Sequence, residues 1–336
     1  MKKWMSFVLA LVLVLGLVSC GGMDGDDREE SIPADEEEVV IEPANLRVAA
    51  LKGPTGMGLV QLMKDSDNGN TGTNSYEFTL VGAPDEVVAG IGGGTLDIAC
   101  VPANLGAVLY NNTNGALQVL AVNTLGVLYI VENGESVQSV ADLAGRTIYS
   151  SGKGSTTEYA LQHILDSYGV EATVEWKSEH AECVAAVMAD ANGVALLPQP
   201  FVTVAQTQND KIRVALDLNQ LWEELGDGSA LITGCVVARK EVVEANPAAI
   251  DLFLQQYAAS VEAVNGDYEA AAALIEEYGI LKAAVAQKAL PYCNIVCIKG
   301  ETMKAQLGAY LELLHAQNPK AVGGTLPNED YYYIGT

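Results

Sequence analysis

A turn rich in glycine and hydroxyl residues, at residues 149–158, carries the residue types best suited to binding chemistry. It follows a short apolar run and precedes a segment with helical spacing of apolar residues, which predicts a strand, a turn and a helix start. Backbone amides at a helix start are free and lie at the positive end of the helix dipole, and glycine lets a ligand approach them closely. We therefore expect this turn to bind a carboxylate, sulfonate or phosphate, or the polar edge of a heterocycle.

A structural alternative explains the same turn without a ligand. Ser155 is then only the N-cap of the helix, and Glu158 closes a capping box. The two roles are compatible. An ATP-binding P-loop is not indicated, because Gly154 stands where that motif needs Ser or Thr after Gly-Lys. The predicted ligand-binding residues of the turn are Tyr149, Ser151, Gly152, Gly154, Ser155, Thr156 and Thr157.

Two further loops follow predicted strands, at residues 46–51 and 96–101. Strand and helix patterns alternate along the chain, which implies a parallel sheet with helices on both faces. Ligands of such sheets bind at the carboxyl ends of the strands. The alternatives are a capped helix with Pro54 in its first turn, and a simple strand stop at Pro102. From these loops we predict one wall of a crevice, formed by Lys52, Thr55, Gly56, Met57, Pro102 and Asn104.

The alternating elements fall into two blocks, so the fold class is α/β with two lobes. We expect a first lobe of residues 46–124 and 232–336 and a second lobe of residues 125–231. The chain would cross between the lobes twice, and two crossings side by side make a hinge. Beyond the elements above, strands are expected at 76–81, 146–150, 173–176, 193–197, 211–216 and 231–238. Helices are expected at 54–63, 84–91, 103–110, 137–143 and 181–189, and another follows Pro200 and ends at about residue 208. The chain after residue 238 is expected to be largely helical.

The amino-terminal residues predict export. Lys2 and Lys3 precede an apolar run at 7–18, too short for a comfortable membrane span, and Leu-Val-Ser-Cys ends at Cys20. This sequence resembles a bacterial lipobox, which implies a signal peptide of residues 1–19, a lipid on Cys20 and anchoring to the outer face of the cell membrane. The alternative is a plain secretory signal with a chance cysteine. Residues 20–45 are strongly acidic and are expected to form a disordered tether.

Composition excludes several classes of function. A formal net charge of −25 argues against nucleic acid as a partner. The same charge means that local dipoles must hold an anionic ligand, because the field of the whole protein repels it. The cysteines besides Cys20 are scattered and odd in number, which is no disulfide framework. Three histidines without ligand-like spacing predict no metal site, and we expect no cofactor.

The lipobox, the two-crossing organisation and the segments 50–57, 97–99 and 151–156 resemble substrate-binding lipoproteins of ABC importers. The most similar branch is that of thiamine-pyrimidine precursor, nitrate and sulfonate binding proteins. The resemblance implies a type II periplasmic-binding-protein fold with two doubly wound sheets, and a monomer that clamps a small ligand between its lobes and delivers it to a permease and its ATPase. It also implies a cleft contact at Gln199. Tyr149 and Trp176 are candidates for stacking, although core packing suits Trp176 better.

Two other functions remain open from the sequence. One is a ligand-sensing domain that serves a membrane receptor. The other is an enzyme on the same fold, of the chorismate dehydratase type, although no catalytic constellation is evident. Cys100 is the single candidate nucleophile, and a buried inert thiol explains it better. We therefore expect a binding protein and not an enzyme.

Overall fold

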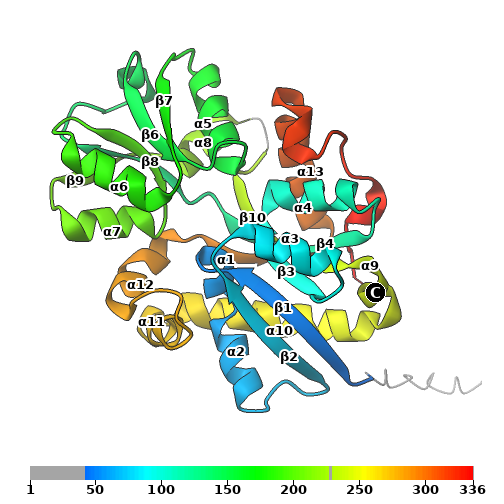
Figure 1. Cartoon of the computed structure of the whole chain (residues 1–336). Coiled ribbons are helices and arrows are strands. Elements are labelled where there is room, and N and C mark those ends of the chain that lie inside the picture. Colours follow the sequence, from blue (N-terminus) through cyan, green and yellow to red (C-terminus); the bar gives the residue numbers. More distant parts are fainter. Residues whose placement is uncertain (1–41, 227–228, 336) are drawn as a thin grey trace, which may run out of the picture. The chain divides into compact units, whose positions relative to one another are not determined.

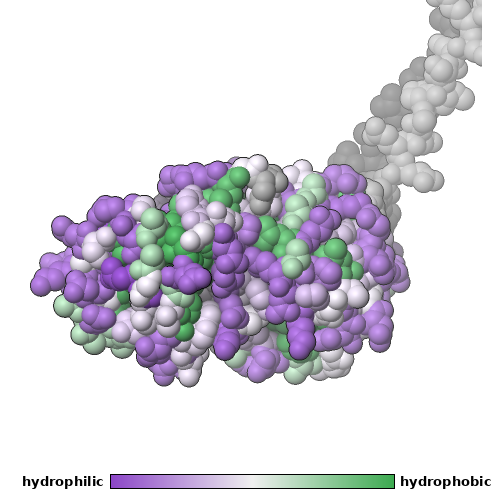
Figure 2. All heavy atoms as spheres, turned by 90° about the horizontal axis from the view of Figure 1, so that it is seen from above, coloured by the Kyte–Doolittle hydropathy of each residue, from purple (hydrophilic) through white to green (hydrophobic). Residues whose placement is uncertain are grey.

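The computed structural model describes residues 42–226 and 229–335. The predicted signal peptide, Cys20 and most of the acidic tether lie outside the described residues. Within the described ranges, no helix is long and apolar enough to cross a membrane. On the face drawn in Figure 2, hydrophilic side chains predominate, and apolar ones form narrow strips between them.

The first lobe is built on a six-stranded sheet in the order β11-β4-β10-β3-β1-β2 (Figure 1). Its strands are almost wholly apolar near the centre, because helices cover both faces of the sheet. The strands are β1 (Ala44–Leu51), β2 (Asn74–Val81), β3 (Ile98–Pro102), β4 (Leu117–Leu125), β10 (Ile232–Arg239) and β11 (Ile295–Ile298). The helices are α1 (Pro54–Met57), α2 (Val60–Asp67), α3 (Pro84–Gly92), α4 (Ala103–Asn112), α9 (Lys240–Ala245), α10 (Pro247–Gly266), α11 (Tyr268–Glu277), α12 (Ala283–Ala289) and α13 (Gly300–Gln317).

The second lobe is built on a five-stranded sheet in the order β7-β6-β8-β5-β9. Its strands are β5 (Leu128–Asn133), β6 (Thr147–Ser151), β7 (Thr173–Lys177), β8 (Val194–Pro198) and β9 (Ile212–Asp217). Its helices are α5 (Thr156–Ser167), α6 (His180–Ala189), α7 (Phe201–Gln208) and α8 (Leu218–Leu225). Short 3-10 helices occur in both lobes, at η1 (Val140–Leu143), η2 (Leu290–Tyr292), η3 (Pro319–Val322) and η4 (Glu329–Tyr331).

The α/β fold with two sheets agrees with the prediction, and β1–β2, β1–β3, β6–β7 and β6–β8 are parallel as expected, but both sheets also contain antiparallel pairs. β10 is antiparallel to β3 and β4, β11 is antiparallel to β4, and β5 is antiparallel to β8 and β9. The cause is the double crossing between the lobes: β4 leads almost directly into β5, and the returning β10 runs beside β4 with Ile232 opposite Leu125. A segment that returns beside the one that left must run the other way. The predicted lobe boundaries themselves remain a prediction.

Two predicted helices differ in detail. The helix expected at 54–63 is divided into α1 and α2, with Gly58 and Leu59 between them. The helix expected at 137–143 is the short 3-10 helix η1, where Ser139 and Asp142 form a capping box. Short amphipathic segments satisfy helical periodicity without the length that a stable α-helix needs.

One apolar cluster joins the two lobes. It contains Val101 of the first sheet, Ile148 of the second, and side chains of the helices packed between them. The rings of Trp222 in α8 and Tyr310 in α13 have centroids 5.9 Å apart. We call this contact between α5, α8 and α13 the apolar seam. Along it the two lobes pack directly against each other.

Candidate functional site

The predicted binding turn lies at the carboxyl end of β6 and leads into α5. Gly152 and Gly154 have φ angles of 80° and 79°, in the left-handed region that glycine adopts without strain. The carbonyl of Gly152 accepts hydrogen bonds from the amide of Ser155 at 3.0 Å and from its hydroxyl at 2.6 Å. These bonds close a tight turn immediately before the first residue of α5.

The capping role predicted for Ser155 is confirmed, whereas Glu158 makes a different contact from the one that a capping box needs. Ser155 is the N-cap of α5, and its hydroxyl accepts from the amide of Thr157 at 3.3 Å. The carboxylate of Glu158 accepts from the amide of Gly154 at 2.5 Å, so no reciprocal capping box forms. Among the described residues, the amides of Lys153 and Thr156 have no acceptor. The turn therefore has capping groups and unused donors together.

One hydrogen bond joins the predicted residues of the two lobes. The hydroxyl of Thr156 in α5 donates to Oδ1 of Asn104 in α4 at 3.2 Å, and both residues are buried. Nδ2 of Asn104 donates to the carbonyl of Ala321 at 3.3 Å. The structure thus brings the glycine turn of the second lobe into contact with the start of α4, which follows β3 in the first lobe.

A residue missed by the sequence reasoning lies beside the turn. Nδ1 of His180, the first residue of α6, is 2.6 Å from Oγ of Ser151. Burial lowers the pKa of His180 to about 4, so the imidazole is neutral at neutral pH. In the tautomer with hydrogen on Nε2, the Ser151 hydroxyl donates to Nδ1 and Nε2–H can donate to a ligand. The rule that selected the strand ends after β1 and β3, applied after β7, would have found this histidine.

The loop after β1 offers fewer side chains than expected. Lys52 is exposed, and Thr55 donates to the carbonyl of Leu51 at 3.3 Å. A Cβ atom on Gly56 would lie 2.6 Å from that same carbonyl oxygen, so the tight turn requires glycine here. Met57 is fully buried in the first-lobe core. Pro102 is the N-cap of α4, at the same edge of the sheet.

Two other predicted residues have protein partners of their own. Oε1 of Gln199 accepts from the hydroxyl of Thr203 at 2.9 Å, and its side chain is buried. The hydroxyl of Tyr149 is 3.4 Å from the carboxylate of Asp190, and Nζ of Lys177 lies 5.3 Å from the centroid of its ring. Tyr149 therefore faces α6 and is not brought together with the glycine turn.

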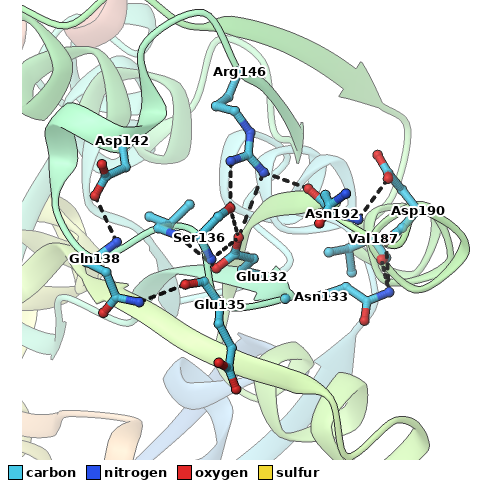
Figure 3. Close-up of polar contacts among 12 residues, drawn as sticks. Glu132, Asn133, Glu135, Ser136, Gln138, Asp142, Arg146, Val187, Asp190 and Asn192 are labelled. Carbon is cyan, nitrogen blue, oxygen red and sulfur yellow. Dashed lines mark hydrogen bonds and ion pairs between the residues drawn. The ribbon is translucent and has the colours of Figure 1, made fainter.

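A charged cluster lies at the end of the second sheet that is remote from the glycine turn (Figure 3). The buried carboxylate of Glu132 accepts from the amides of Ser136 at 2.9 Å and Val137 at 3.0 Å, and from Nη2 of Arg213 at 2.7 Å. Burial alone would raise the pKa of Glu132, but these hydrogen bonds lower it. Arg146 donates to Ser136 at 2.9 Å. Both arginines are thus committed to the fold and do not serve the predicted site.

The described residues show little support for catalysis or metal binding. Burial raises the pKa of the Cys100 thiol to about 12, so the candidate nucleophile stays protonated. No group of three or more His, Cys, Asp and Glu residues within the described ranges could hold a metal ion. The exposed Lys52 and Lys153 form no ion pair there either. They leave positive charge on both predicted loops.

Solved structures share this fold. An ABC transporter protein from Parabacteroides distasonis superposes with a TM-score of 0.73 at 22% identity, over 86% of this chain and 98% of that one. The aliphatic sulphonate binding protein SsuA from Escherichia coli gives 0.69 at 18% identity, over 88% and 94%. The alkanesulfonate-binding protein SsuA from Xanthomonas axonopodis, bound to MOPS, gives 0.63 at 16% identity, over 88% and 98%. These likenesses show a two-lobed periplasmic-binding-protein fold.

Comparison with curated proteins found no match. A family model does match, over residues 70–289, and its description is the phosphonate periplasmic substrate-binding protein of ABC transporters. The broad resemblance stated from the sequence is confirmed, whereas the thiamine-precursor, nitrate and sulfonate branch remains a prediction. Because the match covers well over half of the chain, this protein belongs to the periplasmic substrate-binding family of ABC transporters that this model describes.

Proposed function

We propose that this protein captures a small oxoanion between its two lobes and delivers it to the permease of an ABC importer and its ATPase. It acts outside the cytoplasm as a monomer, through binding and without catalysis, and a lipid on Cys20 anchors it to the outer face of the membrane. The ligand contacts both lobes only when they are closed. Binding therefore shifts the population toward the closed form by the difference in affinity between the two forms.

The observation that carries this proposal is the pair of unused amides, on Lys153 and Thr156, at the start of the twelve-residue helix α5. They lie at the positive end of the helix dipole, where an oxoanion is stabilised. The neutral imidazole of His180, whose Nδ1 lies 2.6 Å from Oγ of Ser151, can add a donor through Nε2–H. Asn104, bonded to Thr156, supplies the first-lobe side.

The ligand class follows from shared chemistry. The matching family is described by phosphonate, and the similar SsuA structures by sulfonates. Both groups are tetrahedral oxoanions that accept hydrogen bonds from amides in the same geometry. The exposed Lys52 and Lys153 add local positive charge that offsets part of the repulsion from a protein with net charge −25.

A charge reversal tests the position of the site. We expect Lys153→Glu to weaken binding of methylphosphonate about tenfold or more, measured by titration calorimetry, with the melting temperature unchanged because Lys153 is exposed. The matched control is Lys211→Glu, which places the same charge at the opposite edge of the second sheet, where β9 begins. Equal affinity of both variants, or no binding of methylphosphonate and methanesulfonate by the unaltered protein, would contradict the proposal.

A further inference from the structure

The carboxyl-terminal segment of the chain, red in Figure 1, packs against α4 of the first lobe. It follows α13 and contains η3 and η4, and we call residues 318–333 the strap. Nδ2 of Asn111 in α4 donates to the strap carbonyls of Val322 and Thr325, both at 2.7 Å. The hydroxyl of Tyr110, also in α4, donates to the carboxylate of Asp330 at 2.6 Å. These bonds fix the strap to the first lobe.

The strap also contacts α5 of the second lobe, once directly and once through Asn104. Nδ2 of Asn318 donates to the hydroxyl of Tyr159 at 3.4 Å. The carbonyl of Ala321 accepts from Nδ2 of Asn104 at 3.3 Å, and Oδ1 of Asn104 accepts from the hydroxyl of Thr156 at 3.2 Å. Residues three apart lie on the same face of a helix, so Thr156 and Tyr159 present one side of α5 to the first lobe.

These contacts lie beside the predicted oxoanion site. Thr156 is the first residue of α5, and its amide is one of the two unused donors there. Because the carbonyl of Ala321 can only accept a hydrogen bond, it holds the NH₂ group of Asn104 and leaves the oxygen of the side-chain amide for Thr156. Separation of the lobes along α5 would break the Asn104–Thr156 and Asn318–Tyr159 bonds, since each joins one lobe to the other.

We propose that the strap is an interlobe clasp, which favours the closed form and holds the start of α5 against the first lobe. The inference rests on the proposed function and adds a device that sets the affinity of the same site. The clasp bonds involve protein atoms alone, so they raise the closed population before a ligand arrives. The apparent affinity of a ligand falls with the population of the form that binds it. Asn318 and Tyr159 are therefore positioning residues that set affinity without contacting the ligand.

Two substitutions at one hydrogen bond test the clasp. Tyr159→Phe keeps the aromatic ring and removes the hydroxyl. Asn318→Ser removes the group that donates to Tyr159 but keeps an oxygen that can cap η3, as Asn318 does. Without ligand, each variant should show a larger radius of gyration in small-angle X-ray scattering. Each should also bind methylphosphonate about three- to tenfold more weakly in titration calorimetry. The double variant should bind no more weakly than either single one, because all three lack the same bond.

The matched control is Tyr278→Phe, which removes a hydroxyl that donates to Asp67 at 2.7 Å within the first lobe. It should keep the radius of gyration and the affinity of the unaltered protein. A radius of gyration or an affinity that stays the same in Tyr159→Phe, or losses that add up in the double variant, would overturn the inference while the proposed function stands. Failure of methylphosphonate to bind the unaltered protein would instead refute the function proposed above, and the scattering of the unliganded variants would still decide whether the clasp exists.

Discussion

At the scale of single residues, Asp97 connects three strands of the first sheet. Its carboxylate accepts from Nε and Nη2 of Arg47 in β1, at 2.8 and 2.6 Å, and from Nη2 of Arg239 in β10, at 2.9 Å. Burial alone would raise the pKa of Asp97, but the hydrogen bonds from the arginines lower it from 3.8 to about 2. Such a buried pair is costly to break, because one partner is left charged and unpaired.

The pKa of Asp97 predicts a specific acid sensitivity. Because the folded value is lower than the unfolded one, the stabilisation is complete above about pH 4 and is lost as the pH falls toward 2. It amounts to about 2 kcal/mol of unfolding free energy. Urea denaturation between pH 2 and 5 should show this loss in the unaltered protein and a smaller one in Asp97→Asn. Asp210→Asn, which removes an exposed carboxylate, should match the unaltered protein; identical pH profiles for all three would contradict the assignment.

Sequence reasoning located the glycine turn because its physics is local. Left-handed glycines and a hydroxyl N-cap before an amphipathic run can be read from adjacent residues. Side-chain direction cannot, since it depends on which face of its strand or helix a residue occupies: Tyr149 of β6 faces Asp190, and Met57 of α1 faces the core. The partners of Thr156 and Ser151, which are Asn104 and His180, come from other elements and follow only from the fold.

At the scale of elements, the contact of α4 with the carboxyl-terminal segment depends on a glycine. A Cβ on Gly106 would lie 2.6 Å from the hydroxyl of Tyr331 and 2.9 Å from Sγ of Cys235, and both side chains are buried. Gly308 in α13 offers a comparison, because its Cβ would meet the hydroxyl of Tyr332 at an ordinary 3.7 Å.

This contrast predicts that glycine-to-alanine substitutions at the two positions change stability in opposite directions. Gly106→Ala should lower the free energy of unfolding by about 1–3 kcal/mol through overpacking. Gly308→Ala should raise it by about 0.5–1 kcal/mol, because alanine loses less conformational entropy in a helix. Chemical denaturation of both variants measures the difference. Stabilisation by Gly106→Ala would show that α4 shifts easily from this contact.

The order and type of most elements could be predicted, because long apolar runs and helical spacing are local signals. The orientation of β5, β10 and β11 could not. A short apolar strand reads the same in a parallel and an antiparallel pair, and the direction is decided by the crossings between lobes. The close packing at Gly58, between α1 and α2, could not be predicted either: a Cβ there would lie 3.0 Å from both the Tyr257 hydroxyl and a methyl group of Ile295, which come from distant parts of the chain.

At the scale of the whole molecule, the apolar seam couples the lobes. Tyr159 of α5 and Trp222 of α8 belong to the same cluster as Tyr310 of α13, and Nδ2 of Asn318 donates to the Tyr159 hydroxyl at 3.4 Å. A shared core of this kind raises the free energy needed to unfold either lobe alone, because that would expose the seam to water.

We therefore predict one cooperative unfolding transition. Far-ultraviolet circular dichroism reports both lobes, whereas the fluorescence of Trp176 and Trp222, measured on protein without residues 1–19 and hence without Trp4, reports the second lobe and the seam. The two signals should have the same midpoint in urea. Midpoints that differ clearly would show that the lobes unfold independently and that the seam contributes little.

The proposed function requires that an oxoanion binds between the lobes at the start of α5. The most direct test is a crystal structure of the protein with methylphosphonate, or with whichever short phosphonate or sulfonate binds most tightly. We expect the oxoanion within hydrogen-bonding distance of the amides of Lys153 and Thr156, with first-lobe atoms on its other side. An oxoanion that occupies another part of the protein at full saturation, with these amides still unpaired, would contradict it.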